Sequence, residues 1–405
     1  MPDPHPDALV PRLGDRSLFP TLEPAAYLNH AAISPHSLAV QRAITAVTAD
    51  YARRGMGAFL TWDAERRRLR GQLARLLGAE VDDIALISNT TRGVTDIALC
   101  LPWRQGDRIV LFEGEFPANV TPWQRAAELF GLEVEMLPLR DFLHDHGHGE
   151  SQGLRSLREA LRQPTRLVAV SAVQFQSGLR MPVPEIAALC HEAGAELFVD
   201  AIQALGVCPI DVVASGVDYL AAGGHKWMMG CEGLGCLYIR RDRVEALQPR
   251  VAGWLSHEDG LGFLLAGAGL LRYDRPIRRR ADFVEGGAYN TIGCAALAAS
   301  LDLILTLGVP AIFEHVQHYI DELEDGLCFR GFTSLRARKT AERSGILSVL
   351  PPNPGDVIGL QRELVERGVS CSTPDGVLRF SPHWPNALAE IPGVLAAVDA
   401  ALGNP

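Results

Sequence analysis

The chain has 405 residues, of which 47% are hydrophobic, and it carries a formal net charge of −10 at pH 7. This length and apolar content support one large domain with a smaller domain beside it. The acidic balance argues against a nucleic-acid-binding surface. No apolar run reaches membrane-spanning length, and the polar, proline-rich N-terminus lacks the apolar core of a signal peptide, so we expect no membrane partner.

Seven apolar runs predict the strands of one sheet. In chain order they cover residues 84–88, 108–112, 133–137, 167–171, 196–200, 217–221 and 234–239. Helical patterns lie between most of these runs, for example at residues 94–101, 122–130 and 184–193. Strands that alternate with helices predict an α/β fold with a largely parallel sheet.

The residues after 290 predict a second unit. They contain helical patterns at 295–307, 311–327 and 393–402, and strand-like runs at 345–350, 369–372 and 377–381. We therefore divide the chain into an N-terminal segment (residues 1–20), a large domain (residues 21–290) and a small C-terminal domain (residues 291–405).

Three further features are interpreted without a catalytic role. The eight cysteines include no C-x-x-C pair, which predicts free thiols in a reducing cytoplasm. The tract His144, His146 and His148 lies in a polar stretch, and a solvated loop is favoured over a metal site. The run at residues 66–68 consists of arginines in a predicted helix with acids nearby, so we interpret it as a solvated face.

Lysine is almost absent from the chain. Only Lys226 and Lys339 are lysines among 38 basic residues. A codon bias towards arginine leaves lysine where arginine cannot replace it, and only an amine that loses its proton forms a Schiff base with an aldehyde. Lys226 follows the predicted strand at 217–221, which favours a covalent anchor for a carbonyl cofactor such as pyridoxal phosphate. The alternative is a surface lysine at a strand-to-helix turn.

An acidic residue upstream of Lys226 supports the cofactor interpretation. Asp200 ends the predicted strand at 196–200, at the edge of the sheet where ligands bind in open α/β folds. A carboxylate there pairs with a pyridinium nitrogen and keeps it protonated. Gln203, three residues later, is a candidate donor to the phenolic oxygen of the ring. The alternative for Asp200 is a helix cap.

These motifs resemble those of a known family. The segments Asp200-x-x-Gln203, Gly224-His225-Lys226 and 233–238 are similar to the class V aminotransferase family of fold-type I pyridoxal phosphate enzymes, which includes cysteine desulfurases, selenocysteine lyases and isopenicillin N epimerase-like proteins. The resemblance runs from about Tyr27 to the end of the chain. It implies a seven-stranded sheet whose last strand is antiparallel, and a small C-terminal α+β domain.

The resemblance also implies a cofactor site. Thr90 and Thr91 stand at the family's phosphate-binding position, at a predicted helix N-terminus, where an ordinary helix cap is the alternative. Gly223 stands where the family often has a serine that binds the phosphate, so His225 is expected to contribute more to phosphate binding. Phe116 stands where cysteine desulfurases have a ring-stacking histidine, and a phenyl ring stacks without moving protons. Its alternative is a core position.

Substrate and subunit contacts follow from the same resemblance. Arg379 matches the arginine that clamps the substrate carboxylate, with a surface arginine on an edge strand as the alternative. Asn29 and His30 lie in a segment that resembles the family's substrate-side loop. Ala288 lies in a segment, residues 283–291, similar to the one that reaches the phosphate of the neighbouring subunit. The expected active form is a homodimer with shared sites.

The reaction type is left between alternatives. The first is an amino-acid aminotransferase, or a related epimerase, that works by Cα-proton transfer. The second is a carbon–sulfur or carbon–selenium lyase, including cysteine desulfurase, and the third is a non-catalytic regulator. Phe116 departs from the desulfurase pattern, as do Ala172 and Phe175 after the fourth predicted strand. Cys371, the candidate sulfur carrier, lies in a strand-like run. We therefore expect amino transfer.

Overall fold

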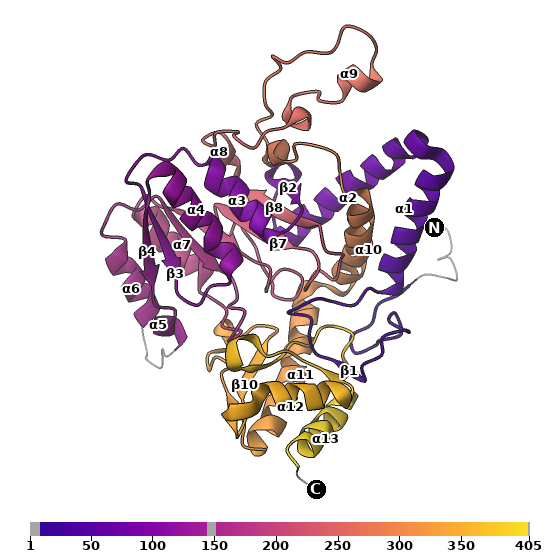
Figure 1. Cartoon of the computed structure of the whole chain (residues 1–405), viewed down its shortest axis with the longest axis vertical. Coiled ribbons are helices and arrows are strands. Elements are labelled where there is room, and N and C mark those ends of the chain that lie inside the picture. The colour runs from indigo at the N-terminus through magenta and orange to yellow at the C-terminus, as the bar shows by residue number, and fades with distance from the viewer. Residues whose placement is uncertain (1–8, 144–150, 404–405) are drawn as a thin grey trace.

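A seven-stranded sheet lies at the centre of the larger part of the computed structural model, which describes residues 9–143 and 151–403 (Figure 1). Its strand order is β2-β8-β7-β6-β5-β3-β4. The strands are β2 (Ile84–Ile87), β3 (Arg108–Phe112), β4 (Glu133–Leu137), β5 (Leu167–Ser171), β6 (Glu196–Asp200), β7 (Tyr219–Gly223) and β8 (Gly235–Ile239). β8 is antiparallel to β2 and β7, and the other pairs are parallel.

All seven predicted strands and the antiparallel β8 are confirmed. One difference is that β7 begins and ends two residues later than predicted. Its ladder with β8 continues to the pair Gly223–Gly235, where a Cβ on Gly235 would lie 2.9 Å from the Gly223 Cα. Glycine at position 235 therefore lets the two strands meet at the end that leads to Lys226.

Helices cover both faces of the sheet, so inner strands such as β5, β6 and β7 are buried on both sides, whereas the edge strand β4 is partly exposed. The helices are α1 (Leu38–Arg54), α2 (Phe59–Leu77), α3 (Thr90–Cys100), α4 (Thr121–Phe130), α5 (Arg140–Leu143), α6 (Gln152–Ala160), α7 (Val183–Glu192), α8 (Arg241–Val244), α9 (Gly262–Leu265) and α10 (Thr291–Leu307). One core contains residues of α3 and α4, and the other contains residues of α2, α6, α7 and α10. Successive strand residues alternate between them: Phe198 joins the first core, and Leu197 and Val199 join the second.

The C-terminal unit lies below the sheet in Figure 1. It contains α11 (Val309–Phe329), α12 (Val357–Glu366), α13 (Ile391–Ala401), and an antiparallel sheet of β9 (Thr333–Ser334), β10 (Leu347–Leu350) and β12 (Leu378–Phe380). α11, α13, β10 and β12 confirm the corresponding helices and strand-like runs predicted after residue 290, whereas α12 and β9 were not predicted. A further strand pair, β1 (Ala26–Tyr27) with β11 (Val369–Ser370), joins the start of the predicted large domain to this unit.

The predicted domain boundaries stay predictions. α10 begins at residue 291, four residues earlier than its predicted pattern, because Asn290 caps it by accepting a hydrogen bond from Gly293 N at 2.9 Å. It packs against α1 and α2 of the larger part, whereas α11 packs against α13. Near the N-terminus, Phe19 lies 5.5 Å from Trp384 between ring centroids.

One surface interpretation is wrong. Arg66 is buried rather than solvated, because its guanidinium binds Glu285 and lies 3.4 Å from the Tyr289 ring centroid. Within residues 9–143 and 151–403, no single helix has the length and apolarity to cross a bilayer, and only the pair α10 and α11, bent by 78°, would by length and composition. The same residues hold no cluster of three metal-ligating side chains. The His144, His146 and His148 tract lies outside them.

Candidate active site

The carboxyl ends of the central parallel strands gather the candidate residues at one edge of the sheet. Asp200 ends β6, and its strand partners are Ser171 at the end of β5 and Ala221 in β7. Lys226 follows the end of β7 by three residues, and Glu115 follows β3 by three residues. Parallel neighbours end on the same side, so residues from three separate strands come together there.

Lys226 is half-buried at this edge. Burial lowers the pKa of its amine to about 8, the charge of Arg379 pushes in the same direction, and Asp200 opposes the shift. The Lys226 Nζ lies 5.5 Å from the centroid of the Phe116 ring. An amine with this pKa is partly unprotonated near neutral pH, which is the form that attacks a carbonyl carbon.

Asp200 is buried, with 2% of its surface exposed. Its Oδ1 accepts a hydrogen bond from Ile202 N at 2.9 Å, and its Oδ2 has no hydrogen-bond partner among the described residues. Burial and the charge of Glu115 together raise the pKa of the carboxyl group to about 7, and the hydrogen bond from Ile202 N and the charge of Lys226 oppose the shift. No helix follows β6, so the helix-cap alternative does not hold. The orphaned oxygen fits a pyridinium N–H donor, which would restore the ionised form.

Gln203 is also buried at this edge, but its amide already has two protein partners. Its Nε2 donates to the Ala31 carbonyl at 3.0 Å, and its Oε1 accepts from Trp227 Nε1 at 2.9 Å. One N–H of the amide is left for the phenolic oxygen of a cofactor ring. Gln203 thus connects Ala31 to the loop that carries Lys226.

Glu115 was missed as a site residue in the sequence. Its buried carboxylate accepts hydrogen bonds from Ser171 N at 2.7 Å, Gln174 Nε2 at 2.9 Å, Asn119 Nδ2 at 3.3 Å and the Ser171 hydroxyl. Burial raises its pKa and these donors oppose the shift. The sequence signal was an acid three residues after a predicted strand, in the segment quoted for Phe116.

Phe116 does not belong to the core, because 44% of its surface is exposed. Its ring meets that of Phe175 edge to face at 5.4 Å between centroids. The core alternative is therefore wrong, and the two rings form an apolar wall beside Lys226. Ala172, at the other position where desulfurases carry a polar residue, is buried.

The N-terminus of α3 lies next to the end of β7. Asn89 caps the helix by accepting from Arg92 N at 2.8 Å, and the buried Thr90 hydroxyl accepts from Gly223 N at 3.0 Å. Thr91 is exposed. The helix-cap role thus belongs to Asn89, which leaves the Thr90 and Thr91 hydroxyls beside the free N–H groups that bind anions.

His225 takes the space beside Gly223. A Cβ on Gly223 would lie 3.1 Å from the His225 Cε1, so glycine makes room for the imidazole. His225 is half-buried, and burial followed by the charge of Lys226 lowers its pKa. Its neutral ring is therefore the prevailing form near pH 7.

Arg379 lies in β12 and is only 4% exposed, which excludes the surface alternative. It donates to the Phe175 carbonyl at 2.8 Å and to Ser372 Oγ at 3.2 Å. Among the described residues no carboxylate forms an ion pair with Arg379, and burial lowers its pKa to about 10. A buried guanidinium without an acidic partner is a site for an anionic ligand.

The two substrate-side candidates at positions 29 and 30 lie in different surroundings. Asn29 pairs with Ser381, two residues from Arg379, and its buried Oδ1 has no partner among the described residues. His30 is buried, its Nδ1 lies 2.7 Å from Ser34 Oγ, and its ring lies 5.3 Å from that of His383. Asn29 is thus brought beside the Arg379 strand, whereas His30 lies under the Lys226 loop.

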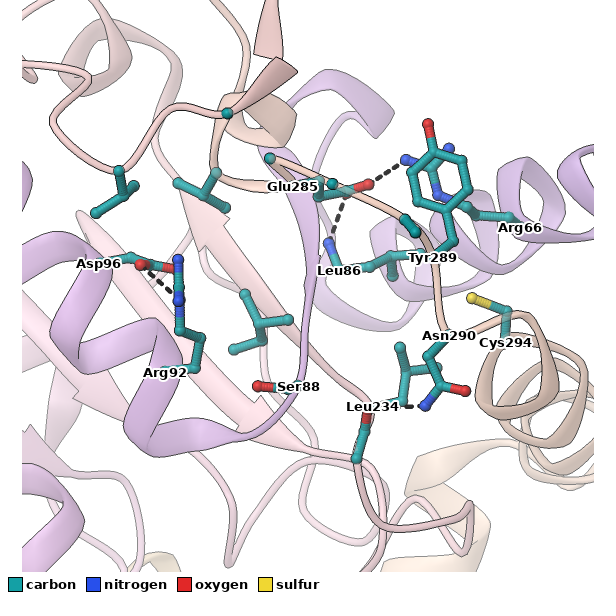
Figure 2. A pocket seen from close by; sticks show the side chains of 18 residues that line it. Arg66, Leu86, Ser88, Arg92, Asp96, Leu234, Glu285, Tyr289, Asn290 and Cys294 are labelled. Carbon is teal, nitrogen blue, oxygen red and sulfur yellow. Dashed lines mark hydrogen bonds and ion pairs between the residues drawn. The ribbon is translucent and has the colours of Figure 1, made fainter. Parts of the chain in front are cut away.

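A cavity of about 430 Å³ opens beside the start of α3 (Figure 2). Ser88 and Arg92 line one side, and Ala288 and Asn290 belong to the segment that lines the other. Lys226 and Asp200 are not among its lining residues. The structure therefore places Ala288 near the candidate phosphate end, but not at the lysine of its own chain.

Cys371 is a structural thiol in this fold. It follows β11, is 2% exposed, and burial raises its pKa to about 12. All eight cysteines are free, and Cys328 is the exposed one. A thiol at Cys371 is therefore neither ionised nor accessible at neutral pH.

The chain is similar to proteins of one family over most of its length. The aminotransferase class-V profile matches residues 26–376. An uncharacterised aminotransferase, YcbU, of Bacillus subtilis (strain 168) is 27% identical over 379 residues, which cover 93% of this chain and 94% of that protein. A probable cysteine desulfurase of Methanothermobacter thermautotrophicus is 30% identical over 400 residues, which cover 92% of this chain and 94% of that protein.

Solved structures show the same architecture. The complex between the cystine C–S lyase C-DES and its reaction product cysteine persulfide has a TM-score of 0.84 and 25% identity, and the match covers 94% of this chain and 98% of that chain. A C-DES mutant with glycine covalently linked to its pyridoxal phosphate cofactor has a TM-score of 0.85 and 26% identity, covering 95% and 98%. These likenesses confirm the α/β fold expected from the sequence.

The burial of Cys371 predicts slow chemical modification. Treatment of the native protein with a thiol alkylating reagent should label Cys328 first and leave Cys371 unlabelled until denaturant is added, because only an exposed thiolate reacts quickly. Peptide mass spectrometry over a time course measures this order. Rapid labelling of native Cys371 would contradict the structural assignment and revive the sulfur-carrier alternative.

Proposed function

Because this chain belongs to the class V aminotransferase family and uses pyridoxal phosphate, we propose that it catalyses amino transfer from an amino-acid substrate, with Lys226 moving the Cα proton. The observation that carries this proposal is that two groups lie at the same edge of the sheet. One is an amine whose pKa is lowered, and the other is a buried carboxylate oxygen without a hydrogen-bond donor. Lys226 has a pKa of about 8, and Asp200 Oδ2 has no partner among the described residues.

Each candidate residue has a proposed role. Bound pyridoxal phosphate supplies an electron sink for the bond that breaks at Cα. Lys226 holds the cofactor covalently and, once released by the substrate amine, takes and returns the Cα proton at Nζ. Asp200 Oδ2 holds the proton on the ring nitrogen. Phe116 stacks against the ring, and Gln203 donates to its phenolic oxygen.

The remaining candidates bind the two anionic groups. Thr90, Thr91 and His225 bind the phosphate together with free N–H groups of α3. Arg379 binds the substrate carboxylate, with Asn29 beside it, and so fixes which Cα bond faces the ring. These assignments use three polar groups at the site. The Asp200 and Asn29 oxygens have no hydrogen-bond partner among the described residues, and the buried Arg379 guanidinium has no carboxylate partner among them.

The surroundings of Lys226 support proton transfer through one base. The wall next to its amine consists of Phe116 and Phe175, which carry no exchangeable side-chain proton. Epimerisation by two bases needs a second base on the opposite face, where the stacking Phe116 offers none. Amino transfer requires only one base, which moves a proton from one carbon to another, and Lys226 alone can serve as that base.

A direct carbon–sulfur lyase is the second candidate. It is favoured by the likeness to the cystine C–S lyase C-DES. Elimination also begins with removal of the Cα proton, so the same Lys226 would serve. The buried Cys371 counts against the cysteine desulfurase version, which needs a mobile, nucleophilic thiol.

The test is a panel of amino acids offered to the purified protein with and without a 2-oxo acid. Amino transfer predicts a new amino acid only when the 2-oxo acid is present, with the cofactor changing its absorbance in the half reaction. Pyruvate with sulfide or persulfide from cystine or cysteine, independent of a 2-oxo acid, would establish the lyase instead. Sulfide release that is lost in Cys371→Ala would establish a desulfurase.

Lys226 should be needed for covalent attachment of the cofactor, whereas Asp200 should be needed for turnover but not for attachment. Borohydride should fix the cofactor to the peptide that contains Lys226, and label on Lys339 would end this assignment. Asp200→Ala should still be labelled at Lys226 but lose about 100-fold or more in kcat, because a preorganised charge at the ring nitrogen is gone. Near-native turnover of Asp200→Ala would show that the end of β6 does not hold the ring.

We also propose a homodimer in which Ala288 completes the partner's site. Ala288→Arg and Lys226→Ala should each be inactive alone. Their mixed dimers should recover about a quarter of the activity, because half of the randomly mixed dimers carry one intact site out of two. Sedimentation gives the oligomeric state. A fully active monomer, or no recovery on mixing, would contradict shared sites.

A further inference from the structure

The loop that carries Lys226 is held by bonds from outside itself. The carbonyl oxygens of four consecutive residues, 225–228, each accept a hydrogen bond from a distant part of the chain. The donors are Ser34 N to His225 O at 2.9 Å, Ser34 Oγ to Lys226 O at 2.6 Å, His383 Nε2 to Trp227 O at 2.8 Å, and Ser300 Oγ to Met228 O at 2.8 Å. Three segments far apart in sequence thus converge on one turn.

The donor groups are buried and their proton positions follow from their partners. Ser34 and His383 have 2% and 0% of their surface exposed. His383 Nδ1 accepts from Trp384 N at 2.7 Å, so its ring proton is on Nε2, which donates to Trp227 O. Ser34 Oγ donates to Lys226 O, so it accepts from the His30 Nδ1–H at 2.7 Å. Each of these bonds therefore has one direction.

The turn is also strained and tightly packed. Met229 has a positive φ of 53° although it is not glycine, and such a backbone persists only where the surroundings enforce it. Gly206 approaches from the other side, so closely that a Cβ there would lie 2.4 Å from Trp227 O. Hydrogen bonds from Ser34, His383 and Ser300 therefore hold the turn in a backbone conformation that its own residues do not favour.

We propose that Ser34 and His383 are positioning residues that aim the Lys226 amine by fixing its backbone. The proposal rests on the proposed role of Lys226 as the cofactor anchor and proton carrier. An amine that must first reach the cofactor aldehyde and then the Cα proton needs a fixed origin, because its four-carbon side chain is flexible. Ser34 and His383 hold the carbonyls on and next to the lysine, which fixes that origin from two sides.

The experiment compares Ser34→Ala and His383→Ala with conservative and control variants. Ser34→Thr keeps a hydroxyl, and His383→Gln keeps an N–H donor near the Nε2 position. Ser344→Ala is the control, since Ser344 is 1% exposed and its hydroxyl donates to a backbone carbonyl, that of Gly178, at the same 2.6 Å. It therefore loses a matched bond whose acceptor is not one of the carbonyls of residues 225–228.

Three measurements are made on each variant: the rate at which apoprotein attaches added pyridoxal phosphate, the pH midpoint of the bound cofactor's absorbance, and kcat with KM. Ser34→Ala and His383→Ala should slow attachment and lower kcat by about tenfold each, with KM changed less than about twofold, because orientation rather than substrate binding is lost. The pH midpoint should shift, while Ser34→Thr and His383→Gln recover part of each change.

The outcomes separate this inference from the proposed function. If borohydride fails to label Lys226 in the unaltered protein, the proposed function fails. If Lys226 is labelled but Ser34→Ala and His383→Ala behave like Ser344→Ala, with a lower melting temperature and unchanged attachment rate and pH midpoint, the positioning role is wrong. Changes confined to Ser34→Ala and His383→Ala support it.

Discussion

The burial of Asp200 and Lys226 at neighbouring strand ends is the constraint around which this site is built. Removing a carboxylate and an amine from water opposes the ionised form of both, so the pKa of one rises to about 7 and that of the other falls to about 8. Among the described residues, no donor reaches Oδ2 of Asp200. A cofactor that offers a protonated ring nitrogen to Asp200 and an aldehyde to Lys226 satisfies both groups, so its binding is coupled to the stability of the fold.

Much of this arrangement was predictable from the sequence. Short apolar runs alternating with helical patterns specify a parallel sheet, and a parallel sheet brings the ends of β6 and β7 to one edge, which is why Asp200 and Lys226 were found by their chemistry and spacing. The contacts of Arg66 were not predictable in this way. Arg66 lies in an ordinary helical run of arginines, and only the approach of Glu285, over 200 positions later, makes it a buried ion pair.

The supports of the site escaped prediction for the same reason. In the sequence Glu115 is indistinguishable from an ordinary acidic loop residue. Its buried position is evident only in the fold, where Ser171 at the end of β5 donates to it. Ser34 and His383 carry no recognisable pattern, because the carbonyls that they hold belong to residues about 150 to 190 positions away. Backbone acceptors have no sequence signature at all, so the reason for a serine or histidine that binds them is visible only in the fold.

Similar long-range bonds connect Arg379, the proposed substrate clamp, to Lys226. Ser381 lies two residues after Arg379, and its hydroxyl accepts from Ala31 N at 3.0 Å. Three residues after Ala31, Ser34 donates to Lys226 O. Residues 29–34 therefore link the C-terminal unit, which carries the guanidinium proposed to bind the substrate carboxylate, to the sheet, which carries the proposed cofactor anchor. Since amino transfer needs the Cα–H bond aligned with the Lys226 amine, the relative position of these two units matters as much as either group alone. Residues 29–34 contribute hydrogen bonds that fix it, together with the direct bonds from His383 to Trp227 O and from Arg379 to Phe175 O.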